Sequence, residues 1–292
     1  MENKAQNPRV AVIFMLSATA FIAGTMLMAK LLGTDALGPA LHPMQVSFGR
    51  FLFALLVISS AIAAMRPKFS RPSWRIHIGR TTFGWVGVTL MFASVAFIPL
   101  GDATAISFLN PVFGMIFAIP FLGERVGRWR WLAAAMAFLG ALVLLRPGGD
   151  GLQFGALLAL AAAIFLGMEL IFIKKLANRE KPIQILFINN AMGATIATIA
   201  VSFVWQNPTM AQWICMGVLG LLMASAQACF VNAMARADAS FVTPFSYLTL
   251  VFAVLYDLVF FSILPDWVSW LGAAIIIAGA VLLAWREALQ RK

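Results

Sequence analysis

The chain has 292 residues, of which 62% are hydrophobic and only 11% are charged. A soluble domain has roughly 45–50% apolar and about 25% charged residues, so this composition excludes a soluble protein and predicts one that crosses a membrane repeatedly. The net charge of +10 does not indicate a nucleic-acid surface, because the basic residues form no stripe with interleaved aromatic residues.

Ten apolar stretches, separated by Gly, Pro and clusters of charge, are long enough to cross the hydrocarbon core of a bilayer, which needs about 20 residues. The first is longer than the apolar region of a signal peptide, typically about 7–15 residues, so we interpret it as a retained helix. The prediction is an all-α polytopic membrane protein with ten transmembrane helices near residues 10–32, 44–65, 76–98, 102–122, 129–146, 152–174, 184–205, 211–235, 241–263 and 267–286.

The distribution of Lys and Arg predicts the orientation of these helices. With a cytoplasmic N-terminus, 18 of the 21 basic residues fall in segments on the cytoplasmic side, and only Lys30, Arg50 and Arg146 fall elsewhere. Cytoplasmic loops of membrane proteins are enriched in Lys and Arg. We therefore expect both termini in the cytoplasm and a lipid bilayer as the chain's environment.

The two halves of the chain repeat each other at an offset of 139 residues. The motif Pro-x-Gln-x-x-Phe occupies residues 43–48 and again residues 182–187. Five crossings per half is an odd number, so the two copies are expected in opposite orientations. The sequence thus predicts two inverted repeats, residues 1–147 and 148–292, with a solute site between them near the membrane midplane.

Motifs for metal, cofactor or nucleotide chemistry are missing from the sequence. Cys215 and Cys229 lie about 21 Å apart along one predicted helix, too far for a disulfide. No His/Cys cluster has metal-ligand spacing, and no Walker-type glycine loop occurs. The connections are too short to build an enzyme site, and no repeated filter or charged ring indicates a channel. We expect neither a cofactor nor an enzyme.

Several short motifs occur in a characteristic order. Arg50-Phe51 lies in the second stretch, Asp102-Ala103 and Asn110-Pro111-Val112-Phe113 lie in the fourth, Leu122-Gly123-Glu124-Arg125 ends it, and Leu-Gly-Ala-Leu-Val-Leu occupies 139–144. With the five-plus-five pattern, this resembles the drug/metabolite transporter superfamily, specifically its EamA-type permeases. The second half departs from the pattern, since Leu250 stands where Pro111 would be and Ile263 where Glu124 would be.

The resemblance implies movement of small organic metabolites across the bacterial inner membrane. Within the family the chain is similar to the aromatic amino-acid exporter branch of YddG-like proteins. The resulting hypothesis is a secondary transporter that exports amino acids, aromatic or other large neutral ones, by alternating access. The alternative is a broad drug or metabolite exporter coupled to protons through an intramembrane carboxylate. The oligomeric state stays open.

Charged residues within the predicted spans need an explanation, because a charge at the centre of a helix costs about 2.5–3.5 kcal/mol on insertion scales. Glu169 and Asp257 are candidates for proton coupling or for binding a substrate ammonium group. The competing interpretation makes them structural, with Asp257 paired to Arg50 or Lys30. For Lys30, snorkelling to the outer interface is a further expectation.

Uncharged polar and aromatic side chains within the spans are the remaining candidates for the substrate pocket, since such pockets combine apolar walls with a few polar groups. Each could instead be interhelical contact only. Pro111 and Pro244 are candidates for hinges or static kinks, because proline interrupts a helix. The predicted substrate-binding residues are Trp85, Met91, Ser94, Phe108, Asn110, Glu169, Gln227, Phe230, Asn232 and Tyr247.

Overall fold

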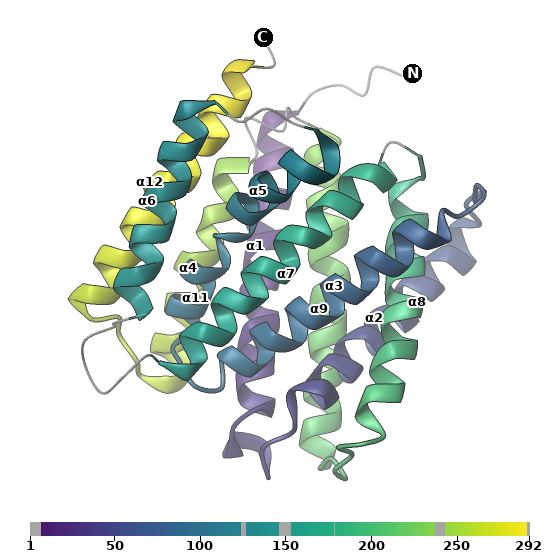
Figure 1. Cartoon of the computed structure of the whole chain (residues 1–292). Coiled ribbons are helices and arrows are strands. Elements are labelled where there is room, and N and C mark those ends of the chain that lie inside the picture. The colour runs from purple at the N-terminus through teal and green to yellow at the C-terminus, as the bar shows by residue number, and fades with distance from the viewer. Residues whose placement is uncertain (1–6, 124–126, 146–152, 178, 237–242, 291–292) are drawn as a thin grey trace.

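The computed structural model describes residues 7–123, 127–145, 153–177, 179–236 and 243–290, and these residues form a bundle of helices with short connections (Figure 1). The first half contains α1 (Pro8–Leu32), the short 3-10 helix η1 (Asp35–Leu37), α2 (Pro43–Met65), α3 (Trp74–Ser94), α4 (Leu100–Ser107), α5 (Asn110–Leu122) and α6 (Arg128–Leu145). The second half contains α7 (Phe154–Ala177), α8 (Pro182–Val201), α9 (Met210–Met234), the 3-10 helix η2 (Thr243–Tyr247), α11 (Leu248–Phe261) and α12 (Trp267–Gln290).

Many of these helices have the length and composition of membrane spans. Six helical stretches within the described residues are long and apolar enough to cross a bilayer, with α4 and α5 counted together as one, and three further apolar stretches are shorter. Large apolar side chains also remain exposed on the outside of the bundle, such as Ile199 at 61% and Val259 at 71%. These findings confirm the prediction of an all-helical, multi-pass membrane protein.

The expected helix boundaries agree with the structure to within four residues, but two stretches are not continuous as expected. The stretch 102–122 is divided into α4 and α5, and the stretch 241–263 into η2 and α11. Pro111 has no N–H to donate to the Ser107 carbonyl four residues earlier, so α4 ends at Ser107. Pro244 falls within η2, and its side chain lies outside the described part of the chain.

Helices from the two halves pack along one another in pairs. α1 packs along α9, α3 along α7, and α6 along α12, while α2 contacts both α8 and α9. The α6–α12 pair forms one edge of the bundle, and the start of α1 and the end of α12 lie at the same end of the molecule (Figure 1). Every one of these pairs joins a helix before residue 146 to one after residue 152, so the halves share one interface.

The repeated glutamines of the Pro-x-Gln motifs each bind the other half of the chain. The Gln45 amide donates to the carbonyl of Gln206 (2.7 Å) and accepts from its backbone N–H (3.1 Å). The Gln184 amide makes the same two bonds with Ser70, at 3.1 and 2.8 Å. Both glutamine side chains are fully buried, so their pairing satisfies groups that would otherwise be costly.

The α6–α12 pair depends on glycine at two positions that the 139-residue offset also relates. A Cβ added at Gly140 would lie 2.7 Å from the carbonyl oxygen of Gly272, and one added at Gly279 would lie 2.7 Å from that of Ala133. Both distances are shorter than any van der Waals contact, so only glycine permits this close approach of the two backbones.

Candidate functional site

Three charged side chains meet in the interior of the bundle and form what we call the charged cluster: Arg50 of α2, Arg80 of α3 and Glu169 of α7. Arg80 Nε lies 3.6 Å from Glu169 Oε1, and the Nη1 of Arg80 donates to the carbonyl of Ile185 in α8 at 3.2 Å. Arg50 and Arg80 are 4% and 6% exposed, and the Glu169 side chain is 15% exposed. Helices of both halves therefore contribute charge of both signs to one buried place.

Gly84 of α3 makes room for the Glu169 carboxylate. A Cβ added to Gly84 would lie 2.7 Å from Glu169 Cδ and 2.7 Å from its Oε1. The carboxylate thus rests directly on the backbone of α3, one turn from Arg80. Because α3 and α7 pack along each other, the absence of a side chain at residue 84 sets the position of the acid.

Arg50 is the member of the cluster that has no ion partner within 4 Å among the described residues, and like Arg80, whose Nε makes no hydrogen bond, it has a buried nitrogen with an unmet hydrogen bond. Its Nη1 is buried and has no hydrogen-bond partner within the described residues. The guanidinium lies 4.2 Å from the centre of the Phe51 ring and interacts electrostatically with Glu169 and Arg80. Two cations and one anion leave the cluster with a net charge of +1.

Trp85, a predicted substrate-binding residue, supplies a second unmatched donor next to Gly84. Its indole Nε1 is buried without a partner among the described residues, while its ring is partly exposed. An indole N–H is a donor only, so it needs an acceptor that the described protein does not supply. Trp85 and the Glu169 carboxylate, which rests on Gly84, therefore lie at the same height along the α3 axis.

Asp257, the other predicted coupling carboxylate, lies in a complete ion pair. Its Oδ1 is 3.0 Å from Lys30 Nζ, and its Oδ2 accepts the backbone N–H of Gly101 at 3.1 Å. Lys30 also lies 4.6 Å from the centre of the Phe261 ring and is 6% exposed. The predicted pairing of Asp257 with Lys30 is thus present, and a coupling role of Asp257 stays a prediction, whereas the expected snorkelling of Lys30 is wrong, because its ammonium group is buried and binds Asp257 instead.

A second buried polar network ties the start of α3 to the connection between α7 and α8. His77 Nε2 lies 2.9 Å from Glu180 Oε2, and Glu180 also accepts the backbone N–H of Ser73 (2.7 Å) and the Gln184 amide (2.6 Å). Burial alone would raise the pKa of the Glu180 carboxyl. The hydrogen bonds from His77, Ser73 and Gln184 outweigh it and hold the pKa below its ordinary value.

Two predicted pocket residues, Phe108 and Tyr247, lie at the breaks of the two divided stretches. Phe108 follows α4 and Tyr247 precedes α11, and their rings meet edge to face with centroids 5.2 Å apart. Their numbers differ by 139, so the repeat relates these two residues to each other. Asn110 and Pro111 open α5 beside this contact; Asn110 is partly exposed and Pro111 is exposed.

Two further candidates on α3 lie beyond the charged cluster. Met91 is 2% exposed and packs in the apolar core. Ser94 ends α3, and its buried hydroxyl has no partner within the part of the chain that the structure describes.

The candidates on α9 are separated from the charged cluster. α9 runs beside α2 with Met216 against Gly49 and Gly220 against Phe53. At about 1.5 Å per residue, Gln227 lies about 15 Å beyond the level of Arg50. Phe230 and Asn232 lie further along α9. Phe230 is 39% exposed, and the Asn232 side chain is engaged by its own helix, accepting from Arg236 at 2.6 Å and donating to the Ala228 carbonyl at 2.8 Å.

Sequence reasoning missed Arg80, His77 and Glu180. Arg80 was counted among the basic residues of the cytoplasmic segments, although it lies in the second turn of α3 and is buried. The sequence signal that could have identified Arg80 is its spacing of four residues from Gly84, which puts both residues on the same face of the helix. Glu180 was not recognised, because a single acid in a short connection carries no motif.

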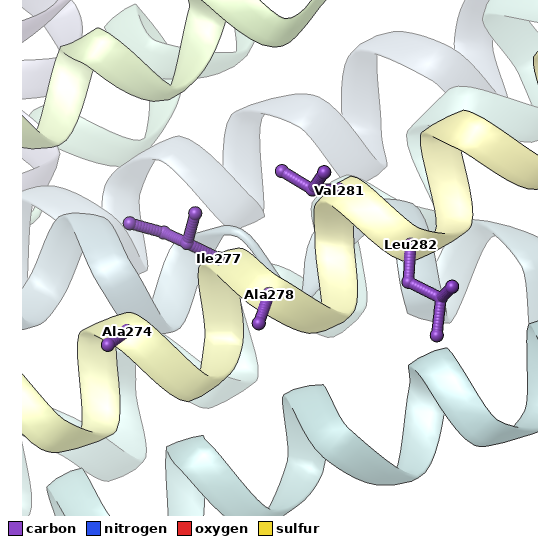
Figure 2. Close-up of a pocket in the computed structure, with 5 residues that line it drawn as sticks. All are labelled: Ala274, Ile277, Ala278, Val281 and Leu282. Carbon is purple, nitrogen blue, oxygen red and sulfur yellow. The ribbon is translucent and has the colours of Figure 1, made fainter.

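A hollow of about 620 Å³ lies along α12 and is lined by Ala274, Ile277, Ala278, Val281 and Leu282 (Figure 2). Figure 2 shows Ile277 and Val281 on one side of the helix and Leu282 on the other. All five side chains are apolar, so they offer nothing that could recognise a polar solute. We therefore assign the candidate site to the charged cluster and not to this hollow.

Comparison with known proteins identifies the fold and the family of the chain. The fold matches that of a solved crystal structure with a TM-score of 0.66 at 20% identity, over 97% of this chain and 99% of that one. The chain is 34% identical to a riboflavin transporter of Rhizobium johnstonii, over 81% of this chain and 78% of the relative. It is 30% identical to an S-adenosylmethionine uptake transporter of Rickettsia felis, over 96% and 94%.

A third relative, a pseudopaline exporter of Pseudomonas aeruginosa, is 25% identical over 82% of this chain and 83% of that protein. The model of the EamA-like transporter family matches the chain twice, at residues 9–146 and 153–285. The chain is therefore a transporter and not an enzyme, and it belongs to the EamA-like transporter family of the drug/metabolite transporter type.

Proposed function

We propose that the chain is a secondary transporter that exports amino acids or closely similar zwitterionic metabolites across the bacterial inner membrane. The charged cluster carries the proposal, because it presents buried charge of both signs at the junction of α2, α3 and α7. A zwitterion carries a carboxylate and an ammonium group and complements such a site. Apolar and aromatic neighbours such as Trp85 suit the rest of the solute.

The mechanism that we propose is alternating access between two inverted repeats, residues 1–147 and 148–292, each with five crossings. The reciprocal glutamine bonds to Ser70 and Gln206 and the glycine contacts of α6 and α12 support this symmetry. The breaks at Phe108 and Tyr247 lie where the halves meet, which supports a hinge role for the segments around Pro111 and Pro244. Both termini would then lie in the cytoplasm.

The topology is tested by labelling single cysteines in a variant without Cys215 and Cys229. Cysteines at the exposed positions Ala40 and Asn207 should react with a membrane-impermeant maleimide from outside intact cells. Cysteines at Arg71 and Arg179 should react only after the membrane is opened. Labelling of positions 40 and 71 from the same side would contradict the proposed crossings.

The transport activity is tested by counterflow in proteoliposomes. Vesicles loaded with an unlabelled amino acid should accumulate the labelled one, and riboflavin and S-adenosylmethionine serve as comparison solutes. The reaction should be strongly reduced by Glu169→Gln, which removes the negative charge of the cluster. Absence of counterflow for every amino acid, alongside counterflow of another solute, would refute the substrate class but not the transporter.

The alternative function is a drug or metabolite exporter that is coupled to protons through Glu169 or Asp257. The partial exposure of the Glu169 side chain supports this alternative, because protons must be able to reach a coupling carboxylate. Binding of a lipophilic cation that is lost in Glu169→Gln would favour this alternative.

A further inference from the structure

Arg50 and Trp85 each have a buried nitrogen, Nη1 and Nε1 respectively, that lacks a hydrogen-bond acceptor among the described residues. Leaving a buried donor unpaired costs about 1–3 kcal/mol, and more when the group is charged. The Phe51 ring beside the Arg50 guanidinium offers a cation–π contact but no hydrogen-bond acceptor for Nη1.

The two donors lie at the same level of the bundle. The hydroxyls of Ser47 in α2 and Thr89 in α3 are hydrogen-bonded at 2.7 Å, which fixes how the two helices are aligned. α2 and α3 are joined by a short connection, residues 66–73, and run in opposite directions. One turn from Ser47 and from Thr89 toward that connection therefore reaches Arg50 and Trp85 together.

The net charge of the cluster, like its unmet hydrogen bonds, indicates an anionic partner for Arg50. Glu169 pairs with Arg80 at 3.6 Å and rests against Gly84, whereas no acid among the described residues lies within 4 Å of Arg50. Arg50 remains as the net positive charge in a buried place. A buried charge without an ion partner is strongly unfavourable, so this position favours an anionic partner.

We propose that Arg50 and Trp85 form a subsite for the carboxylate of the transported solute. The inference rests on the proposed transport function and narrows its substrates to molecules with a carboxylate group. The guanidinium supplies the charge and a planar pair of donors, and the indole N–H fixes the second oxygen. A carboxamide of the same shape keeps one acceptor oxygen but lacks the negative charge, so it binds much more weakly.

Matched pairs of solutes test the subsite. L-phenylalanine and L-phenylalaninamide are compared as competitors in counterflow. In parallel, 3-phenylpropionate and 3-phenylpropionamide are compared for their effect on the thermal unfolding temperature of the purified protein, since a ligand that binds the folded state stabilises it. Each carboxylate should bind at least about tenfold more tightly than its amide, as expected for a hydrogen bond to a charged group.

Two variants locate the effect. Trp85→Phe removes the indole N–H, together with part of the ring system, and should reduce the preference for carboxylate over amide by about tenfold. Arg50→Gln should abolish the preference, and Trp85→Phe suffices if that variant does not fold. Trp213→Phe is the matched control, because Trp213 packs on Phe53 and Trp205 outside the charged cluster.

The results separate the subsite from the transport function. If no amino acid shows counterflow, the proposed function fails, while the unfolding measurements with 3-phenylpropionate still decide the subsite. Stabilisation by the carboxylate that disappears in Trp85→Phe but not in Trp213→Phe supports the subsite. Equal effects of carboxylate and amide, no stabilisation by the carboxylate, or an unchanged preference in both cluster variants would overturn it.

Discussion

Replacing Gly84 by alanine perturbs the charged cluster through a single methyl group. The new Cβ would lie 2.7 Å from Glu169 Cδ, 2.7 Å from Oε1 and 3.0 Å from Oε2. Carbon atoms in contact settle at about 3.5–4.0 Å, so the carboxylate has to move by about 1 Å. Because the acid is held between Gly84 and Arg80, its displacement changes the ion pair.

The size of the effect follows from the distance between Arg80 Nε and Glu169 Oε1, which is 3.6 Å. With an effective dielectric constant of about 20, two unit charges at this distance attract each other by about 4.6 kcal/mol, and by about 3.6 kcal/mol if they lie about 1 Å further apart. A loss of about 1 kcal/mol corresponds to about a fivefold change in a binding constant. A cationic group of the solute that is held by Glu169 at a similar distance would lose about as much from the same displacement, so we expect solute affinity in Gly84→Ala to fall by about that factor.

The assay is concentration-dependent counterflow, together with thermal unfolding of the purified variant. Gly217→Ala is the control, because a Cβ added there meets the Phe53 ring at an ordinary contact distance of 3.8 Å. Combining Gly84→Ala with Glu169→Asp shortens the acid by one methylene group. The loss in this double variant should be smaller than the sum of the two single losses.

An unchanged affinity in a well-folded Gly84→Ala protein would refute the assignment of Glu169 to the solute site. Equal losses in Gly84→Ala and Gly217→Ala would do the same, because they would reflect general helix packing and not the carboxylate.

Asp257→Asn should lower the free energy of unfolding by about 3–5 kcal/mol, because it leaves the buried Lys30 charge unpaired. The double variant Lys30→Met with Asp257→Leu should restore most of this stability. Denaturant unfolding measures both variants, and an Asp257→Asn protein as stable as the unmodified one would contradict the pairing. The depressed pKa of Glu180 contributes stability that is fully present above its ordinary value of 4.5 and is lost as the pH falls through the lower folded-state pKa. Thermal unfolding between pH 3 and pH 7 should therefore show an acid loss that is smaller in Glu180→Gln. Gln184→Ala should lower the unfolding temperature more than Gln45→Ala, since both break a pair of bonds to a backbone N–H and carbonyl but Gln184 also bonds to Glu180 (2.6 Å) and to the Ser70 hydroxyl (3.3 Å), and equal losses would argue that these additional bonds contribute nothing.

The sequence predicted the all-helical, multi-pass character and the positions of the long helices well, because the bilayer imposes strong constraints on length and hydrophobicity. The boundaries of the long helices follow directly from apolar runs, and Pro111 marked the place where the stretch 102–122 divides. The division before α11 was less predictable, because Leu250 occupies the position that corresponds to Pro111. A 3-10 turn such as η2 depends on the surrounding packing more than on any local residue.

The site was predicted only in part, because a candidate residue can be recognised from its type but its partner cannot. Glu169 and Trp85 stood out as polar groups in apolar runs. Their neighbour Arg80 did not, since it lies near a helix end where basic residues usually face water. The ion pair of Asp257 with Lys30 joins residues 227 positions apart, and the sequence offered Arg50 as an equal alternative.

The central claim is that solute binds at the charged cluster between the two halves. The most direct test is a cryo-EM structure of the purified protein saturated with the amino acid that counterflow selects. We predict density for the solute between α2, α3 and α7, with its carboxylate against Arg50 and Trp85. Solute density in the apolar hollow along α12, with the cluster unchanged, would contradict the account.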